Sequence, residues 1–166
     1  MILQDFHFSR RELTLTRAWV RSFWGVWEGG QLVAALHAAP PFYDVSEMLG
    51  RGVPASSGDI AMKDYVMLYS VAVTEGKRRG RVGAQLLGKM EDVALKAGSK
   101  TVYGVTSADS AAFYKARGYQ VQKPDEMFRT YWGESEVAFS ISGDAQWFSK
   151  GLKRRSSSWL TNLFNP

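Results

Sequence analysis

The clearest hydrophobic pattern lies near the middle of the chain. Residues 62–73 are almost continuously apolar and rich in β-branched and aromatic side chains, which is typical of a central strand covered on both faces. A polar loop follows at residues 74–80. Apolar residues then recur at helical spacing over residues 82–97, and Gly98 is a natural C-terminal cap. This part of the chain is therefore predicted to form a strand, a loop and a helix.

The first third of the chain is predicted to contain strands around one helix. Ser9 and Glu12 form a capping box, in which each side chain satisfies a free amide at the start of a helix that runs to about Arg21. Gly29-Gly30 separates two apolar runs, which favours a tight hairpin because both glycines tolerate a positive φ. The short apolar runs predicted as strands are residues 1–6, 23–27 and 32–36.

The pattern breaks at Ala39. Prolines and glycines recur from Pro40 to Gly58, which predicts an irregular stretch of about twenty residues with no more than a short turn of helix at 45–49. Loops of this length are usually functional lids or mobile segments. We therefore expect this loop to contribute to substrate recognition.

Further strands and a helix follow the central helix. Residues 101–105 predict a strand, and residues 107–117 predict a helix that ends at Gly118. Residues 119–122 and 136–141 are predicted to close the sheet. The order of these elements indicates an α/β (α+β) fold with a mixed central β-sheet flanked by helices on both sides.

The end of the chain is predicted to be a separate segment. Asp144 and Ser158 are each placed to cap a short apolar helix. The division is a domain at residues 1–143 and a basic amphipathic C-terminal tail at residues 144–166. An apolar stripe beside basic residues is the pattern of a segment that docks on a protein partner, an anionic membrane or nucleic acid, and folding back on its own domain is the alternative. The basic residues are Lys150, Lys153, Arg154 and Arg155.

Composition narrows the possible chemistry. The chain has 166 residues, which fits one domain, and no cysteine, which excludes disulfides, cysteine-based zinc sites and a thiol nucleophile. Two histidines are too few for a histidine-rich metal site, so we expect no metal. No apolar run reaches the length of a transmembrane segment, and the N-terminus lacks the order of a signal peptide. A cytoplasmic setting is therefore expected.

The net charge of +5 is concentrated in two clusters, one at residues 77–81 and one in the tail. The first cluster lies between the predicted central strand and its helix. Free amides at a helix N-terminus bind anions, glycine lets the backbone approach a ligand, and arginines add bidentate contacts to phosphate oxygens. This loop is therefore a candidate diphosphate site, although its spacing fits neither the nucleotide P-loop nor the dinucleotide fingerprint. The pattern does not favour a nucleic-acid-binding module, because no aromatic residues are interleaved with the basic ones.

The segment from Val71 to Leu87 resembles the coenzyme loop of the GNAT superfamily of acyl-CoA N-acyltransferases. That family has a strand ending in a tripeptide like Val71-Ala72-Val73, then an Arg/Gln-x-x-Gly-x-Gly/Ala loop that opens a helix. Arg78 matches the leading arginine of the loop and Gly83 its last glycine. Arg81 stands where the first glycine is expected, with Gly80 one position earlier.

A second segment, residues 107–119, resembles the second coenzyme-contacting helix of the same family. Phe113-Tyr114 and Gly118-Tyr119 fit the family's aromatic-Tyr-x-x-x-Gly-Phe/Tyr pattern, and Ser107 replaces its asparagine and is placed to cap the helix. The resemblance implies a GNAT-like fold and acetyl-CoA as co-substrate. The coenzyme-binding residues that it implies are Val71, Val73, Arg78, Arg79, Gly80, Arg81, Val82, Gly83 and Ser107.

The implied reaction is direct transfer of an acetyl group to a primary amine of a small molecule or protein. In the family, backbone amides near Val71 and Val73 hold the pantetheine and polarise the thioester carbonyl, and Tyr114 would protonate the departing thiolate. The general base stays open among Asp64, Glu75, His37 and an ordered water. Tyr69 and four other aromatic residues are candidates to line the acceptor site, with a core role as the alternative: Trp24, Trp27, Phe42 and Tyr43.

A second function from another class is also open. The domain can keep the acyltransferase scaffold and serve as a structural or assembly component, for example of a virion or another large complex, anchored by its tail. Arg81 in the loop, Ser107 in place of asparagine and the unassigned base favour this alternative. Binding of acetyl-CoA would distinguish the two.

Overall fold

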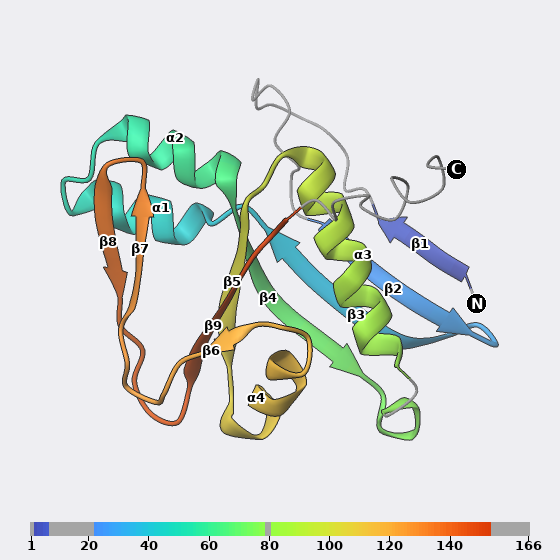
Figure 1. The fold of residues 1–166 in the computed structure, drawn as a ribbon. Coiled ribbons are helices and arrows are strands. Elements are labelled where there is room, and N and C mark those ends of the chain that lie inside the picture. Colours follow the sequence, from blue (N-terminus) through green and yellow to red (C-terminus); the bar gives the residue numbers. More distant parts are fainter. Residues whose placement is uncertain (1, 7–21, 79–80, 154–166) are drawn as a thin grey trace, which may run out of the picture.

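A seven-stranded mixed sheet forms the centre of the protein (Figure 1). The computed structural model describes residues 2–6, 22–78 and 81–153. The strand order is β1-β2-β3-β4-β5-β9-β6, in which only β4 and β5 run parallel. The strands are β1 (Ile2–Phe6), β2 (Ser22–Glu28), β3 (Gln31–Ala39), β4 (Tyr65–Val73), β5 (Thr101–Thr106), β6 (Gln120–Val121) and β9 (Gln146–Gly151).

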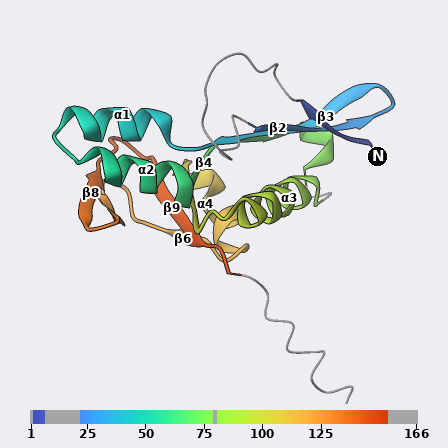
Figure 2. The same ribbon diagram turned by 90° about the horizontal axis from the view of Figure 1, so that it is seen from above.

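Helices cover both faces of this sheet, as predicted. Figure 2 shows α3 on one side of the sheet and α1 and α2 on the other. The two faces have separate hydrophobic clusters. One gathers Leu86 and Met90 of α3 with Leu68, Val102 and Phe148 of the sheet. The helices are α1 (Phe42–Gly50), α2 (Ala55–Asp64), α3 (Val82–Ala97) and α4 (Ala108–Lys115), with a 3₁₀ turn at Glu75–Lys77.

The second cluster joins α1 and α2 to a separate two-stranded sheet, β7 (Phe128–Trp132) and β8 (Ser135–Phe139). Trp132 of β7 is fully buried against this cluster. Polar contacts also connect the parts: the Ser57 and Ser135 hydroxyls are 2.9 Å apart, and the Tyr65 hydroxyl donates to the Tyr131 carbonyl at 2.7 Å. The protein therefore has an additional layer on the face opposite α3.

The predictions for the middle of the chain are confirmed. β4, the loop and α3 follow in the expected order, and Gly98 caps α3 with a φ of +93°. The Gly29-Gly30 hairpin is also present, with both glycines at positive φ. The capping box and the helix predicted over residues 9–21 lie outside the described residues.

The prediction of an irregular loop after Ala39 is wrong, because α1 and α2 occupy most of it. The prolines and glycines mark the ends of these helices. Pro41 and Pro54 are the N-cap residues, and Gly52, at a φ of +91°, follows α1. No described helix is long and apolar enough to cross a membrane.

The helix predicted after Asp144 is also wrong. Residues Gln146–Gly151 form β9, which pairs with β5 on one side and β6 on the other. Lys150, predicted as part of a basic tail, donates to Glu91 Oε2 of α3 at 2.7 Å, and Tyr119 donates to the same carboxylate at 2.8 Å. The fold therefore continues beyond residue 143, and β8 belongs to the small sheet instead of closing the large one. Residues 154–166 lie outside the described part, so a docking tail stays a prediction for them.

Candidate active site

The two parallel strands at the centre of the sheet diverge halfway along their length. β4 pairs with β5 only from Tyr65 to Leu68, and the last partner of Leu68 is Gly104. Beyond this point β4 continues for five residues along β3 alone, after a bulge at Tyr69, where the pairing passes from Ala38–Leu68 to His37–Ser70. The backbones of β4 and β5 therefore separate along their second halves (Figure 1), and this separation is called the opening below.

The backbone of Val71 and Val73 faces this opening. The Thr74 amide donates to the Val33 carbonyl of β3 at 3.0 Å. Because amides alternate in direction along a strand, the amide and carbonyl of Val71 and Val73 point away from β3, toward the side that β5 has left. These two residues therefore present strand groups along the opening that β5 does not pair, where an extended polar ligand can add as a further strand.

Gly104 sits at the vertex of the opening and was not singled out from the sequence. A β-carbon on this residue would lie 2.5 Å from the Leu68 carbonyl oxygen and 2.6 Å from Cζ of Phe148. Glycine is thus needed for β4, β5 and the Phe148 ring to meet here. The pattern of alternating apolar residues in this strand contains no signal for this contact.

A cavity of about 340 Å³ continues the opening at the N-terminus of α3. Its walls combine apolar side chains with four cationic residues. The Arg78 Nε–H donates to the Val73 carbonyl at 3.5 Å, which places the guanidinium at the end of the open strand edge. Lys77 is paired with Glu28 at 2.5 Å, but no ion pair among the described residues involves the three arginines. The lining residues are Val73, Lys77, Arg78, Arg81, Val82, Gly83, Ala84, Phe113 and Arg117.

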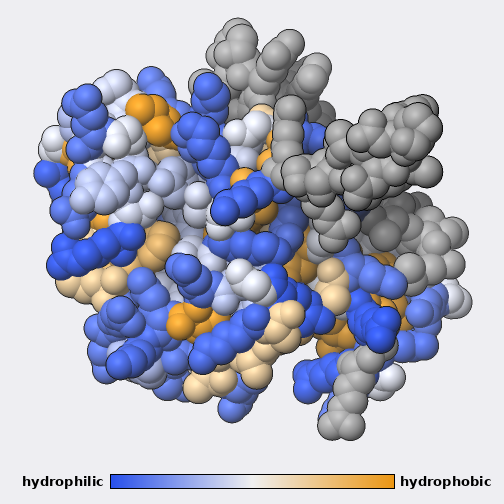
Figure 3. Space-filling view, viewed as in Figure 1, coloured by the Kyte–Doolittle hydropathy of each residue, from blue (hydrophilic) through white to orange (hydrophobic). Residues whose placement is uncertain are grey.

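The predicted members of the coenzyme loop are brought together only in part. Arg78, Arg81, Val82 and Gly83 all line the cavity, and a β-carbon on Gly83 would lie 3.2 Å from Val73 and 3.5 Å from Phe113. Arg79 and Gly80 lie outside the described residues. Figure 3 shows that the face carrying α3 and α4 is mostly hydrophilic, with apolar surface only in small separate areas.

Arg81 has a left-handed backbone, with a φ of +62° and a ψ of +2°, directly before α3. This conformation is unfavourable for residues with a β-carbon and is one that glycine adopts readily. The geometry explains why the family pattern has glycine at this position. Here the arginine side chain is added to the cavity, at the expense of a strained backbone.

Replacing Arg81 with glycine is expected to raise the free energy of unfolding by about 0.5–1 kcal/mol, because relief of the left-handed strain exceeds the added entropy of the unfolded chain. Urea denaturation measures this. Arg78→Gly is the matched control, since Arg78 has a φ of −59° and gains nothing from glycine. A stabilisation of equal size in both variants would contradict the assignment of strain to Arg81.

Arg117 is a cavity residue that the sequence analysis missed. It lies two residues beyond α4, where its Nη1 donates to the Phe113 carbonyl at 2.8 Å and its guanidinium carbon lies 3.8 Å from the centre of the Phe113 ring. Its Nε is buried and has no hydrogen-bond partner among the described residues. The stacking directs a third guanidinium, with an unused donor, toward the cavity that Arg78 and Arg81 line.

Tyr114 packs next to the vertex of the opening. Its ring stacks on Phe148 with 4.0 Å between centroids, and Phe148 in turn contacts the Gly104 region. Burial raises the pKa of the Tyr114 phenol above its usual value of 10, so the proton is retained at neutral pH. Ser107 is the N-cap residue of α4, as predicted, but its hydroxyl makes no capping hydrogen bond within the described chain.

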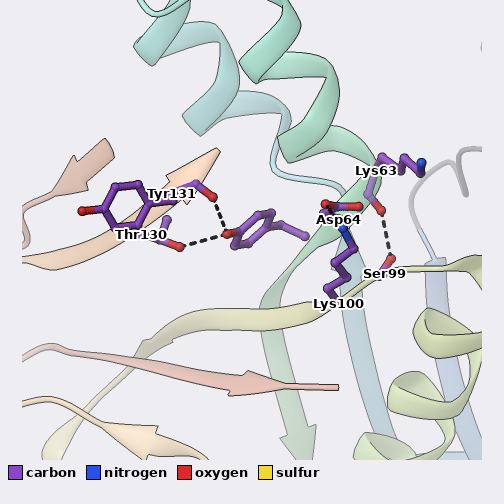
Figure 4. A network of polar contacts seen from close by, with 7 residues as sticks. Lys63, Asp64, Ser99, Lys100, Thr130 and Tyr131 are labelled. Carbon is purple, nitrogen blue, oxygen red and sulfur yellow. Dashed lines mark hydrogen bonds and ion pairs between the residues drawn. The ribbon is translucent and has the colours of Figure 1, made fainter. Parts of the chain in front are cut away.

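The candidates for the general base are spread along the sheet. Asp64 lies at the far end of β4 from the opening, where its Oδ2 accepts from Lys100 Nζ at 2.7 Å (Figure 4). Glu75 is exposed in the 3₁₀ turn. His37 stacks between Phe23 and Tyr69, with centroid distances of 4.1 and 4.8 Å. None of these geometries distinguishes a base.

The aromatic residues proposed to recognise the acceptor have different roles. Trp24 is buried in the cluster beneath α3, which is the core alternative. Trp27 is half-buried on β2. Phe42 and Tyr43 begin α1, and Tyr43 is 68% exposed. The start of α1, instead of an irregular loop, is therefore the part of residues 40–58 that carries aromatic side chains next to the sheet.

An opening between two parallel strands, next to a cation-lined helix N-terminus, defines an acyltransferase type of fold. The sequence profile of the acetyltransferase (GNAT) family matches residues 3–119, more than half of the 166 residues. The chain therefore belongs to the GNAT family of acyl-CoA-dependent acetyltransferases, which confirms the resemblance found in the two motifs. β7, β8 and β9 lie beyond the matched range.

Solved structures of this family have the same fold. A GNAT acetyltransferase from Staphylococcus aureus is 14% identical with a TM-score of 0.53, over 80% of this chain and 68% of that one. The aminoglycoside 6'-acetyltransferase type Ii is 18% identical with a TM-score of 0.52, over 81% and 71%. The PaiA N-acetyltransferase from Thermoplasma acidophilum, in complex with coenzyme A, is 13% identical with a TM-score of 0.50, over 79% and 60%. No curated protein matches the chain in sequence.

Proposed function

We propose that this protein transfers an acetyl group from acetyl-CoA to a primary amine by direct transfer. The observation that carries the proposal is the continuity of two features. The open edge of β4 at Val71 and Val73 leads directly to a cavity at the start of α3 that three unpaired arginines line. Acetyl-CoA, an extended chain with amide groups that ends in phosphates, matches these two features in their order.

The pantetheine arm would lie along β4, with its amides bonded to the exposed groups of Val71 and Val73. The pyrophosphate would lie at the N-terminus of α3, where free backbone amides and the helix dipole favour anions. Arg78 and Arg117 both line this cavity and would bind the pyrophosphate oxygens. Arg81 stands where the family pattern has glycine, and its side chain supplies a further cation to the cavity.

The thioester would then lie beside the vertex at Gly104. A backbone amide of β4 is placed to stabilise the negative charge that develops on the thioester oxygen. Tyr114 is placed to give its proton to the departing thiolate, because its phenol stays protonated and its ring lies next to Phe148 at the vertex. The protein's part in the reaction is therefore positioning, charge stabilisation and one proton transfer.

Calorimetric titration of acetyl-CoA into the protein tests this function. Binding with a dissociation constant below millimolar is expected, and Arg78→Ala or Arg117→Gln should each weaken it about tenfold to a hundredfold, the contribution of one or two hydrogen bonds between charged groups. Arg51→Ala is the matched control, because Arg51 is exposed at the end of α1, on the opposite side, and pairs with Glu47. Absence of binding at millimolar acetyl-CoA would refute the proposal.

A further inference from the structure

The point where β4 and β5 separate has one side toward the cluster beneath α3 and the other toward the cluster beneath α1 and α2. Gly104 and Phe148 meet on the α3 face, where Tyr114 also lies. The side chain of the preceding residue, Tyr103, points to the opposite face, because successive side chains alternate along a strand. Tyr103 belongs to the second cluster, with Phe128 and Trp147. Tyr103 is buried there, one residue before the vertex at Gly104.

The Tyr103 hydroxyl donates a short hydrogen bond to Asp44 Oδ2, in the first turn of α1. Three buried or half-buried carboxylates in the described chain accept hydrogen bonds from other side chains: Asp44, Asp64 and Glu91. Asp64 lies at the far end of β4, and Glu91 binds Tyr119 and Lys150 on the α3 face. Of these three, Asp44 is the one bonded to a residue next to the vertex on the α1 face, namely Tyr103.

We propose that Asp44, positioned by Tyr103, binds the acceptor amine and accepts its proton. This inference rests on the proposed acetyl transfer and names the base and the amine-recognition residue that the sequence left open. The Tyr103 hydroxyl occupies Oδ2, which leaves Oδ1 for the ammonium group. Tyr103 is a positioning residue, since its ring is stacked on Phe128 at 5.2 Å and holds the hydroxyl in place.

The electrostatics around Asp44 suit a base. Burial raises the pKa of the carboxyl above its usual value of 3.8, the hydrogen bond from Tyr103 opposes this, and Glu47 on the same helix raises it further. Tyr65 and Tyr69 of β4 lie near Tyr103. No lysine or arginine is paired with Asp44 among the described residues. A raised pKa makes the carboxylate a stronger proton acceptor.

The proton transfers balance in the proposed reaction. The ammonium group gives one proton to Asp44, and the free amine nitrogen attacks the thioester carbon. As the carbon–sulfur bond breaks, the thiolate takes the proton of Tyr114. The nitrogen, now part of the amide, releases its second excess proton to the Tyr114 phenolate, and Asp44 releases its proton to solvent. The products are the acetylated amine, coenzyme A and one proton.

Release of the coenzyme A thiol with acetyl-CoA and three probe amines tests the inference: benzylamine, spermidine and a peptide with a free N-terminus. The protein has no cysteine, so a thiol reagent has no background from it. Asp44→Asn is expected to lower kcat about a hundredfold to ten-thousandfold with any amine that is acetylated, and to leave calorimetric affinity for acetyl-CoA unchanged. Asp44→Glu should restore part of the rate. Asp59→Asn, on the exposed surface of α2, is the matched control.

The pH dependence separates proton transfer from a structural role of Asp44 in attaching α1. The rate should rise with pH as the Asp44 carboxyl loses its proton. Tyr103→Phe removes a hydrogen bond that stabilises the ionised carboxylate, so the pKa of Asp44 rises and this limb of the profile moves to higher pH. A merely structural contact would lower stability without moving the limb.

The outcomes distinguish the two proposals. A protein that does not bind acetyl-CoA refutes the proposed function itself. A protein that binds acetyl-CoA is the case that tests Asp44. There, an unchanged rate and pH profile in Asp44→Asn overturns the inference alone, whereas a failure to acetylate any of the three amines contradicts the proposed transfer and the inference with it. A selective loss of kcat with a shifted profile in Tyr103→Phe supports it.

Discussion

Replacing Tyr114 with phenylalanine is expected to lower kcat for acetyl transfer about a hundredfold to a thousandfold, the usual contribution of a positioned general acid. The ring keeps its stacking on Phe148, so the core and the coenzyme cavity stay intact. The Michaelis constant for acetyl-CoA should therefore stay within about twofold of its original value. Steady-state release of coenzyme A measures both constants.

The neighbouring Tyr119→Phe variant is the control for this experiment. It deletes the same hydroxyl from a ring 5.4 Å from Phe148, but this hydroxyl donates to Glu91 in the core. The expected result is a loss of stability of about 1–3 kcal/mol with kcat unchanged, because the hydrogen bond joins a charged group. Equal losses of kcat in the two variants would show that Tyr114 acts through packing and not through its proton.

The part of the site that could be predicted from the sequence is local in the chain. Arg78, Gly83 and the apolar end of β4 are close in sequence, and a strand, a turn and a helix N-terminus follow from their order alone. The position of Tyr114 followed from a second local pattern. This local pattern could not predict that Phe148 stacks on Tyr114. Phe148 belongs to β9, which pairs with β5 from about forty residues further along the chain.

Two errors have a common physical cause. Proline and glycine were interpreted as marks of a loop in residues 40–58, whereas they cap two short helices, as Pro41 and Pro54 show. Trp147 and Phe148 were assigned to an amphipathic helix, although adjacent large apolar residues also suit a strand buried on both faces. In each case tertiary packing decides between local alternatives of similar propensity.

Arg117 and Asp44 were missed for a related reason. Arg117 is a single charged residue at the end of a predicted helix and Asp44 is one in a predicted loop, and a solvated position is the usual interpretation of both. Only the fold shows that Arg117 turns back over Phe113 and that Asp44 contacts a tyrosine on β5. Long-range contacts of this kind leave no periodic signal in one sequence.

Replacing Gly104 with alanine is expected to lower the free energy of unfolding by about 1–3 kcal/mol and to reduce acetyl transfer more than this loss explains. The new methyl group would overlap the Leu68 carbonyl oxygen at 2.5 Å. This oxygen cannot rotate away, since Leu68 is paired with Ala38 of β3 and with β5. β4 and β5 would have to separate at the vertex, and a displacement of about 1 Å there is expected to lower kcat about a hundredfold.

The Gly88→Ala substitution is expected to change the free energy of unfolding in the opposite direction. It therefore distinguishes steric overlap at Gly104 from a general effect of replacing glycine with alanine. Gly88 lies inside α3, and a β-carbon there would meet no atom within 4 Å. Alanine should therefore stabilise the protein by about 0.5–1 kcal/mol through higher helix propensity and leave kcat unchanged. Urea denaturation and coenzyme A release, measured on both variants, decide the matter. If Gly104→Ala unfolded like Gly88→Ala and kept its rate, the two strands would not need to meet at Gly104, and the vertex would not position the thioester.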